Sequence, residues 1–287
     1  MIAVLGKFVL ALSLLLGSQE ARSPRDVLTA LFTKAKTDPA AVVPLILAAS
    51  AELDPRYPAH RALDLKEARL LADTLEPFCR RAFFTPERLP AMESLGLVLH
   101  TVRAGEVPER IAKHYHIGAG MLVYLNPEFD PRKLREGQAL KVLDLSSRNL
   151  DVVVEKGLYR LAAWSRLEGA HGVLVEYAPV GLGAADSPTP PGKTSIVLRA
   201  RDPDWTDPVT KQVFKAGDPK NVLGGYWMAL DAAGLGRSGI GIHGFTGDAP
   251  ANWIEQPASH GCVRMLQTDI DRLFHLAIEG TPVEIEP

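Results

Sequence analysis

The sequence has few cysteines, almost no net charge, and no extended apolar stretch after its first residues. It has two cysteines in 287 residues, Cys79 and Cys262, which allow at most one disulfide. Its 32 basic and 34 acidic residues give a net charge of −2, so no global field attracts nucleic acid. No segment beyond the N-terminus approaches the length of a membrane-spanning helix. These absences exclude nucleic-acid binding by bulk charge and membrane spans beyond the first residues.

The remaining composition is typical of a soluble globular protein. Hydrophobic residues make up 46% of the chain and charged residues 23%. The length is sufficient for two or three domains, and we expect a multi-domain chain.

The first 23 residues form a separate segment. Lys7 precedes an apolar run from Phe8 to Leu16, which is the pattern of a secretory signal. Gln19 and Glu20 stand where small residues precede a cleavage site, so both a cleaved signal and an uncleaved membrane anchor remain open. The competing interpretation is a cytosolic protein with an apolar first helix. We expect residues 1–23 to direct export.

Residues 24–95 have helical periodicity, and we expect a helical segment. Prolines divide it into short helices at Pro39, Pro44, Pro55, Pro58, Pro77 and Pro86. We find no chemistry here. Cys79, with no histidine beside it, is expected to be a small hydrophobe at a helix surface.

Residues 98–144 predict a strand, two helices and a closing strand. This small βααβ pattern resembles a LysM domain, the module that binds glycan strands containing N-acetylglucosamine. The matching positions are Val102, Gly105, Ile111, Ala112, Tyr115, Leu125, Asn126, Gly137, Gln138 and Leu140. The family usually has Asp-Thr after the turn glycine, where this chain has Glu106 and Val107. The alternative is a LysM-shaped spacer that binds no glycan.

A polar linker at Ser146–Asn149 leads into residues 149–287, a region predicted to be rich in β-strands. Strands are predicted near 152–154, 158–163, 172–177, 194–198, 226–230, 239–243 and 282–285, with loops at 180–183 and 188–192. A helix is predicted to open at Thr268 with Asp271 in a variant capping box, and to end at Gly280.

The segment Ser259–Met265 places Cys262 beside a histidine and a glycine, and His243 lies upstream. A cysteine is nucleophilic near neutral pH when a base or an imidazolium lies beside it, and a thiolate–imidazolium pair stabilises both charges. The alternatives are an inert buried thiol and a zinc site made by His243, His260 and Cys262. Zinc is a poor match, because the candidate ligands crowd one loop and no second cluster accompanies them.

The whole motif, with His243-Gly244 upstream, resembles the signature of L,D-transpeptidases, the cysteine enzymes that cross-link peptidoglycan stems. The resemblance covers roughly the last 140 residues. It implies a β-rich α+β catalytic domain, a β-sandwich with a C-terminal helix. One departure is Phe245, where the family often has threonine.

The resemblance also implies roles for individual residues. Cys262 would be the nucleophile and His243 the base, oriented by the backbone carbonyl of Gly244 in preference to Asp248. Ser259, His260 and Gly261 would shape the loop, whose backbone N–H groups would bind the oxyanion. From residue type alone, Arg264 is a candidate to bind a stem carboxylate. Tyr226, Trp227 and Trp253 are candidate walls of the substrate groove, and their alternative place is the core. Arg264 alternates onto the side of Cys262, and its other interpretation is a structural ion pair.

The resemblance implies no cofactor and no metal. The partners would be peptidoglycan stem peptides and glycan strands, in the periplasm or cell envelope, with inner-membrane anchoring through residues 1–23 if these are not cleaved. Cys262 would attack the third residue of a tetrapeptide stem, release D-alanine and pass the acyl group to another stem, and carbapenems would acylate it. A disulfide would block this chemistry, so we expect both cysteines unpaired. The alternatives are an L,D-carboxypeptidase and a non-catalytic wall-binding scaffold.

Overall fold

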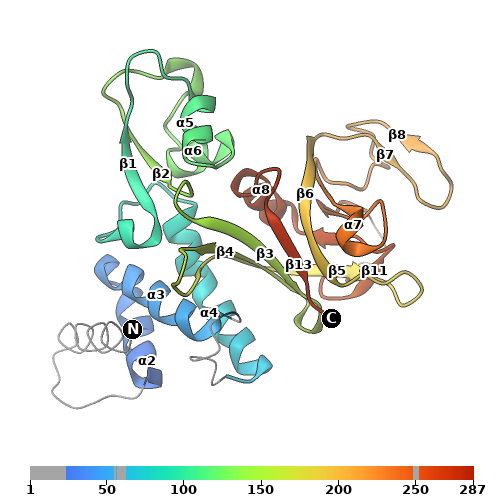
Figure 1. Ribbon diagram of the computed structural model, residues 1–287, viewed down its shortest axis with the longest axis horizontal. Coiled ribbons are helices and arrows are strands. Elements are labelled where there is room, and N and C mark those ends of the chain that lie inside the picture. The colour runs from blue at the N-terminus through green and yellow to red at the C-terminus, as the bar shows by residue number, and fades with distance from the viewer. Residues whose placement is uncertain (1–23, 55, 57–62, 248–251) are drawn as a thin grey trace.

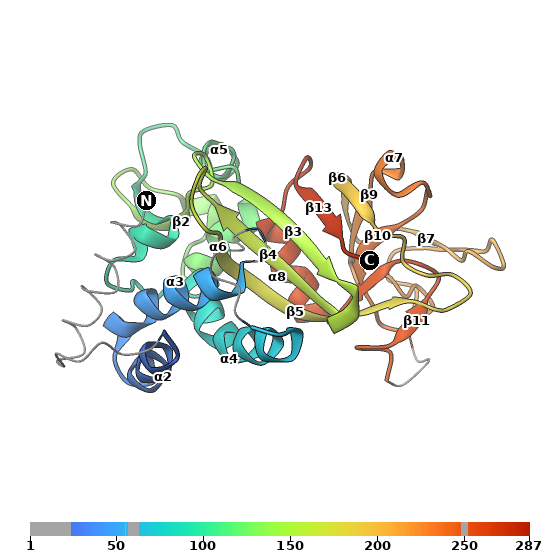
Figure 2. The ribbon, with the colours of Figure 1, turned by 60° about the horizontal axis from the view of Figure 1, so that its bottom comes forward.

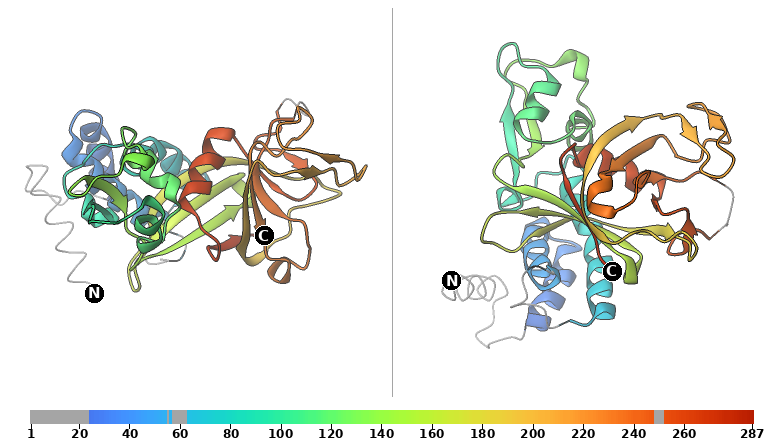
Figure 3. Two further views of the ribbon diagram at one scale, coloured as in Figure 1. Left: turned by 90° about the horizontal axis from the view of Figure 1, so that it is seen from above. Right: turned by 45° about the vertical axis from the view of Figure 1, so that its right-hand side comes forward.

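The protein has a helical segment, a small βααβ unit and a β-rich part (Figure 1). The computed structural model describes residues 24–54, 56, 63–247 and 252–287. The expected signal or anchor at residues 1–23 lies outside them. The small unit and the helical segment stand on opposite sides of strands β3 and β4, Asn149–Glu155 and Arg160–Arg166 (Figure 3). No helix within the described residues is long and apolar enough to cross a bilayer.

The helical segment contains α2, α3 and α4, at Pro24–Ala35, Val42–Leu53 and Leu65–Phe83. Asp64 and Glu67 form a reciprocal capping box that starts α4. The predicted helical character is confirmed, but the predicted division at Pro44 and Pro77 is wrong. Pro44 lies in the first turn of α3, where its missing N–H costs no bond, and α4 continues through Pro77.

Cys79 is on the buried face of α4 and only 1% exposed, so its predicted place at a helix surface is wrong. This face packs with α3 against strand β5, Val173–Gly183 (Figure 2). Burial of this face offsets the cost of a proline inside the helix. Cys79 and Cys262 are both free, as expected.

The small unit has the predicted order of elements. Strand β1, Leu97–Thr101, pairs antiparallel with β2, Ala139–Leu143, and α5 and α6 lie between them at Pro108–His114 and Ala119–Leu125. Its unusual Glu106 accepts a 2.7 Å bond from the backbone N–H of Arg103 and lies 2.9 Å from His100 Nε2. Glu106 therefore fastens the turn after β1. Glycan binding by this unit stays a prediction.

The β-rich part is built on a nine-stranded sheet. Its order is β11-β5-β12-β10-β9-β6-β13-β3-β4, and β4 also pairs with β5, so eight strands form a closed ring with β11 beside β5. The ring strands not yet given are β6 Gly192–Arg201, β9 Tyr226–Leu230, β10 Gly241–Gly244, β12 Val263–Met265 and β13 Pro282–Ile285. Outside the ring are β11 Pro257–Ser259, the β7–β8 hairpin at Trp205–Thr206 and Val213–Phe214, and the short helix α7, Ala232–Leu235.

Two local predictions in this part are wrong. Residues 180–183, predicted as loop, lie in β5, because β11 and β12 supply pairing partners that are distant in sequence. Helix α8 runs from Gln267 to Leu276, and its N-cap is Leu266 without a side-chain cap. Asp271 makes no capping box; it accepts a hydrogen bond from Tyr124 of the small unit.

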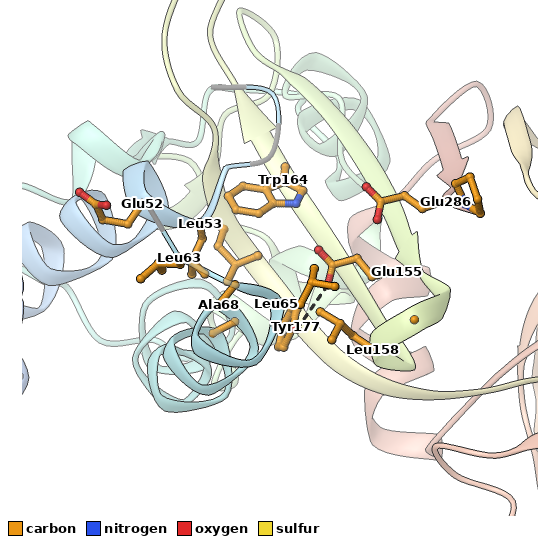
Figure 4. A pocket seen from close by; sticks show the side chains of 14 residues that line it. Glu52, Leu53, Leu63, Leu65, Ala68, Glu155, Leu158, Trp164, Tyr177 and Glu286 are labelled. Atoms are coloured by element: carbon orange, nitrogen blue, oxygen red, sulfur yellow. Dashed lines mark hydrogen bonds between the residues drawn. The ribbon is translucent and has the colours of Figure 1, made fainter. Parts of the chain in front are cut away.

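A cavity of about 140 Å³, lined by apolar side chains together with Glu52, Glu155 and Glu286, lies between the helical segment and the sheet (Figure 4). Its walls include Trp164, whose buried indole N–H has no acceptor in the described part of the chain, and Tyr177, which donates to Glu155 at 3.3 Å. The cavity lies where helices α3 and α4 meet strands β3–β5, so it is a packing gap between the two layers.

Lys141 joins the helical segment to the small unit. Its side chain is 1% exposed, and Nζ donates to the carbonyls of Ala82, Thr85 and Glu87 at 2.7, 2.9 and 2.6 Å. These carbonyls lie at and just beyond the C-terminal end of α4, where a cation also meets the negative end of the helix dipole. Burial lowers the Lys141 pKa to about 8.

We predict that Lys141→Met lowers the free energy of unfolding by about 3 kcal/mol, because three carbonyls lose their donor. Urea unfolding of the full-length chain measures the change. Lys113→Met, at an exposed position on α5, is the control and should cost less than about 0.5 kcal/mol. Equal losses in the two variants would contradict the joining role of Lys141.

Candidate active site

Two parallel strands bring the chemistry-bearing residues together. Ile242, His243 and Gly244 on β10 pair with Val263, Arg264 and Met265 on β12. His243 and Cys262 line one cleft of about 550 Å³, together with Trp227, Ser259, His260 and Arg264. The structure therefore brings the predicted base and nucleophile to the same cavity.

His243 is buried with one ring nitrogen occupied. Its Nδ1 donates to the carbonyl of Gly244, the partner that the family resemblance implied. A neutral imidazole carries one proton, so this bond leaves Nε2 as the acceptor. Burial lowers the His243 pKa to about 4; the Gly244 carbonyl opposes this shift, and the Arg264 cation adds to it. His243 is therefore neutral, with a basic Nε2, at neutral pH.

The Cys262 thiol is also neutral in the resting cleft. Burial raises its pKa, while a backbone hydrogen bond from Gly241 and the cations Arg264 and Arg237 oppose the shift. The thiol donates to the carbonyl of Gly239 at 3.5 Å. Cys262 and His243 are therefore both neutral in the resting cleft. The arrangement suits proton transfer to His243 as Cys262 attacks.

Ser259 shapes the loop that carries Cys262. Its Oγ donates to the carbonyl of Cys262 at 2.6 Å and accepts from the N–H of Gly261 at 3.1 Å. Gly261 has a φ of +111°, and a Cβ there would lie 2.9 Å from Ile240 Cδ1. Since the Gly261 N–H is engaged by Ser259, the oxyanion-binding role expected for it is not supported by the resting geometry.

A pair of aromatic side chains packs against the Arg264 guanidinium. The guanidinium lies 3.8 Å from the centroid of Phe245, and Phe245 packs edge-on against Trp253 at 5.2 Å. NH1 donates to the carbonyl of Ala258 at 2.9 Å. Phe245, the departure from the family pattern, therefore supports Arg264. No carboxylate within the described residues pairs with Arg264, so the interpretation as a structural ion pair fails there.

The three aromatic candidates occupy different places. Trp227 lies opposite His243 on β9, and their ring centroids are 5.6 Å apart in the cleft. Tyr226 packs against Phe274 at 4.7 Å, and Trp253 lies behind Phe245, so neither lines the cleft. Successive strand residues point to opposite faces, which excludes Tyr226 and Trp227 from one cleft. Asp248 lies outside the described residues.

Sequence reasoning missed two walls of the cleft. One is the segment of the β7–β8 hairpin that contributes Trp205 and Val209. The sequence pattern that could have revealed this hairpin is a pair of short aromatic or β-branched stretches around Asp207-Pro208. The other is Arg237, which lies in a glycine-flanked turn just before β10. The part of the chain that is described contains no group of three or more histidine, cysteine or acidic residues that could hold a metal.

The low pKa of His243 predicts a pH dependence of stability. Its folded pKa of about 4 lies below its ordinary 6.5, so the stabilisation is present above pH 6.5 and is lost as pH falls toward 4. Between pH 7 and pH 4 the wild type should lose about 3 kcal/mol more than His243→Gln. Urea unfolding at several pH values measures this, and parallel pH curves for the two proteins would refute it.

The conformation of Gly261 predicts a steric cost. Gly261→Ala places a methyl group against Ile240 and Arg237 at a φ that L-residues rarely adopt, so stability should fall by about 2 kcal/mol. Gly280→Ala is the control, because Gly280 also has a positive φ but open space around it. Thermal unfolding should show the larger loss for Gly261→Ala, and equal losses would argue against crowding.

Comparison with known proteins identifies the family of this chain. The YkuD family, the L,D-transpeptidase catalytic domain, matches residues 149–285. A putative L,D-transpeptidase of Bacillus subtilis, YqjB, is 30% identical over 136 residues, which cover 47% of this chain and 69% of that protein. A putative L,D-transpeptidase of Bacillus licheniformis, YkuD, is 26% identical over 191 residues, 67% of this chain and 100% of that protein.

Among solved structures, a mutant L,D-transpeptidase of Enterococcus faecium is similar to this chain with a TM-score of 0.36 and 21% identity. The match covers 48% of this chain and 49% of that one. The family match at residues 149–285 contains both His243 and Cys262, and with the YqjB relative it shows that the chain belongs to the L,D-transpeptidase family.

Proposed function

We propose that this chain is a peptidoglycan L,D-transpeptidase with Cys262 as its nucleophile. Cys262 attacks the carbonyl carbon of the third residue of a tetrapeptide stem, and its thiol proton passes to Nε2 of His243. That proton then moves to the departing amine, and D-alanine leaves. An amine of a second stem attacks the thioester, loses a proton to His243 and restores the thiol.

One observation carries this proposal. The bond from His243 Nδ1 to the Gly244 carbonyl leaves the basic Nε2 in the cleft that contains Cys262. Burial holds the imidazole neutral at neutral pH, so Nε2 is unprotonated and its lone pair is open to the thiol proton. The same carbonyl stabilises the imidazolium that forms during attack, as a fixed acceptor does for a catalytic histidine.

The oxyanion would be bound by the backbone N–H of Cys262. The Gly261 N–H bonds to Ser259 in the resting loop, and the bond from Ser259 to the Cys262 carbonyl fixes the peptide planes around the nucleophile. Such preorganised donors stabilise a tetrahedral intermediate because they need no reorganisation during the reaction.

The proposal also includes a cellular location for the protein and a role for the small unit. Peptidoglycan stems lie outside the cytoplasm, so export directed by residues 1–23 is part of it, as a cleaved signal or as an anchor. The small unit at Leu97–Leu143 is proposed to hold glycan strands near the cleft.

The test is mass spectrometry of the purified full-length chain mixed with disaccharide-tetrapeptide, beside its Cys262→Ala variant. We predict cross-linked dimers that lack one D-alanine, formed by the wild type and absent with Cys262→Ala. Cys79→Ala is the control, because Cys79 lies in the core away from the cleft, and it should retain the activity.

Two other outcomes would change the assignment. Tripeptide without dimers would identify an L,D-carboxypeptidase, in which water outcompetes the amine. A folded wild type that binds wall sacculi but yields no Cys262-dependent product would identify the scaffold.

A further inference from the structure

Arg237 joins the two loops at the rim of the cleft. Its NH2 donates to the Oγ of Ser187 and to the backbone carbonyl of His260, both at 2.9 Å, and NH1 donates to the carbonyl of Pro188 at 3.4 Å. Ser187 and Pro188 belong to the loop between β5 and β6, and His260 belongs to the Cys262 loop. The Arg237 guanidinium therefore bridges these two loops, next to the residues that precede Cys262.

The charge of Arg237 has no counter-ion in the described structure. Its three acceptors are a hydroxyl and two carbonyls, and no carboxylate within the described residues lies at ion-pair distance. A guanidinium has five N–H donors. Three are used here, so the Nε–H and one NH1 hydrogen remain for a ligand. The side chain is exposed and lines the cleft.

The second arginine of the cleft is placed differently. Arg264 is only 9% exposed, stacked on Phe245 and bonded to the Ala258 carbonyl. The acidic residue lining the cleft is Asp204, and it pairs with Lys215 at 2.7 Å. The cleft therefore has a cationic lining, and Arg237 is the cation that an entering ligand reaches first.

Arg237 also lies close to the residue that precedes the nucleophile. A Cβ on Gly261, the residue before Cys262, would lie 3.0 Å from Arg237 NH1. A group bound by the free edge of Arg237 would thus lie near the reacting carbonyl. In a tetrapeptide donor, the amide nitrogen and one α-carbon separate the scissile carbonyl carbon from the terminal carboxylate.

We propose that Arg237 recognises the terminal carboxylate of the acyl donor, making it the residue that selects anionic ligands for this cleft. The role that sequence analysis gave to Arg264 is thereby assigned to Arg237. The identity of the donor rests on the proposed function, whereas the preference for an anion beside Cys262 does not.

A pair of alkylating agents tests the preference without any peptide. Iodoacetate and iodoacetamide both alkylate Cys262 and differ by a carboxylate in place of a carboxamide. Charged hydrogen bonds contribute about 1.5–3 kcal/mol, so Arg237→Gln should lower the iodoacetate-to-iodoacetamide rate ratio by about tenfold or more in the full-length chain. Arg237→Lys should restore part of the ratio, because it keeps the charge.

The matched control is Arg132→Gln, which removes a positive charge from a side chain that is 89% exposed and lies outside the cleft. Its ratio should equal that of the wild type. A purely structural role for Arg237, as a clamp on the loops, would change both alkylation rates alike. An unchanged ratio in Arg237→Gln would therefore overturn the proposal.

A second measurement separates this inference from the proposed function. Tetrapeptide donors with a free or an amidated C-terminus are compared, and Arg237→Gln should raise KM about tenfold for the free acid and little for the amide. A changed alkylation ratio without turnover of either donor would support anion recognition and refute the transpeptidase. Turnover with equal effects on both donors would support the enzyme and refute the role of Arg237.

Discussion

The site depends on one constraint, the parallel pairing of β10 with β12. Parallel neighbours cannot be joined by a tight turn, so the chain must leave the sheet after Gly244 and return before Val263. The returning segment contains β11 and the Ser259–Cys262 loop, and β11 pairs with the end of β5. The nucleophile therefore sits where an incoming connection enters the sheet, beside a histidine that the neighbouring strand holds in place.

Much of this arrangement was predictable from the sequence, because its causes are local. Glycine-flanked histidine and cysteine, alternating strands and a late amphipathic helix each leave a pattern in neighbouring residues. The Gly244 carbonyl followed from the family resemblance. Arg237 was missed because its role arises from contact with Ser187 and His260, which lie far away in the chain. Residues 180–183 were misassigned for the same reason, since their strand is defined by distant partners.

Other predictions were wrong because the sequence alone does not show which residues a given side chain contacts. Tyr226 and Trp227 are adjacent aromatics, and only the register of β9 against β10 shows which of them meets His243. Cys79 was predicted to lie at a helix surface, but the packing of α4 on β5 buries it. The neutral resting state of His243 and Cys262 is likewise a property of burial, which spacing between residues does not reveal.

Helix α8 links this site to the small unit. At its start, Gln267 packs against Gly244; at its end, the carbonyl of His275 accepts a 3.1 Å bond from the Gly118 N–H. A Cβ on Gly120 would collide with the His275 ring, so the two surfaces fit without a spacer. The helix spans Gln267–Leu276, and at 1.5 Å per residue this is about 15 Å. The helix thus sets a fixed spacing between the small unit and the strand that carries His243, and lengthening α8 by one turn would change that spacing.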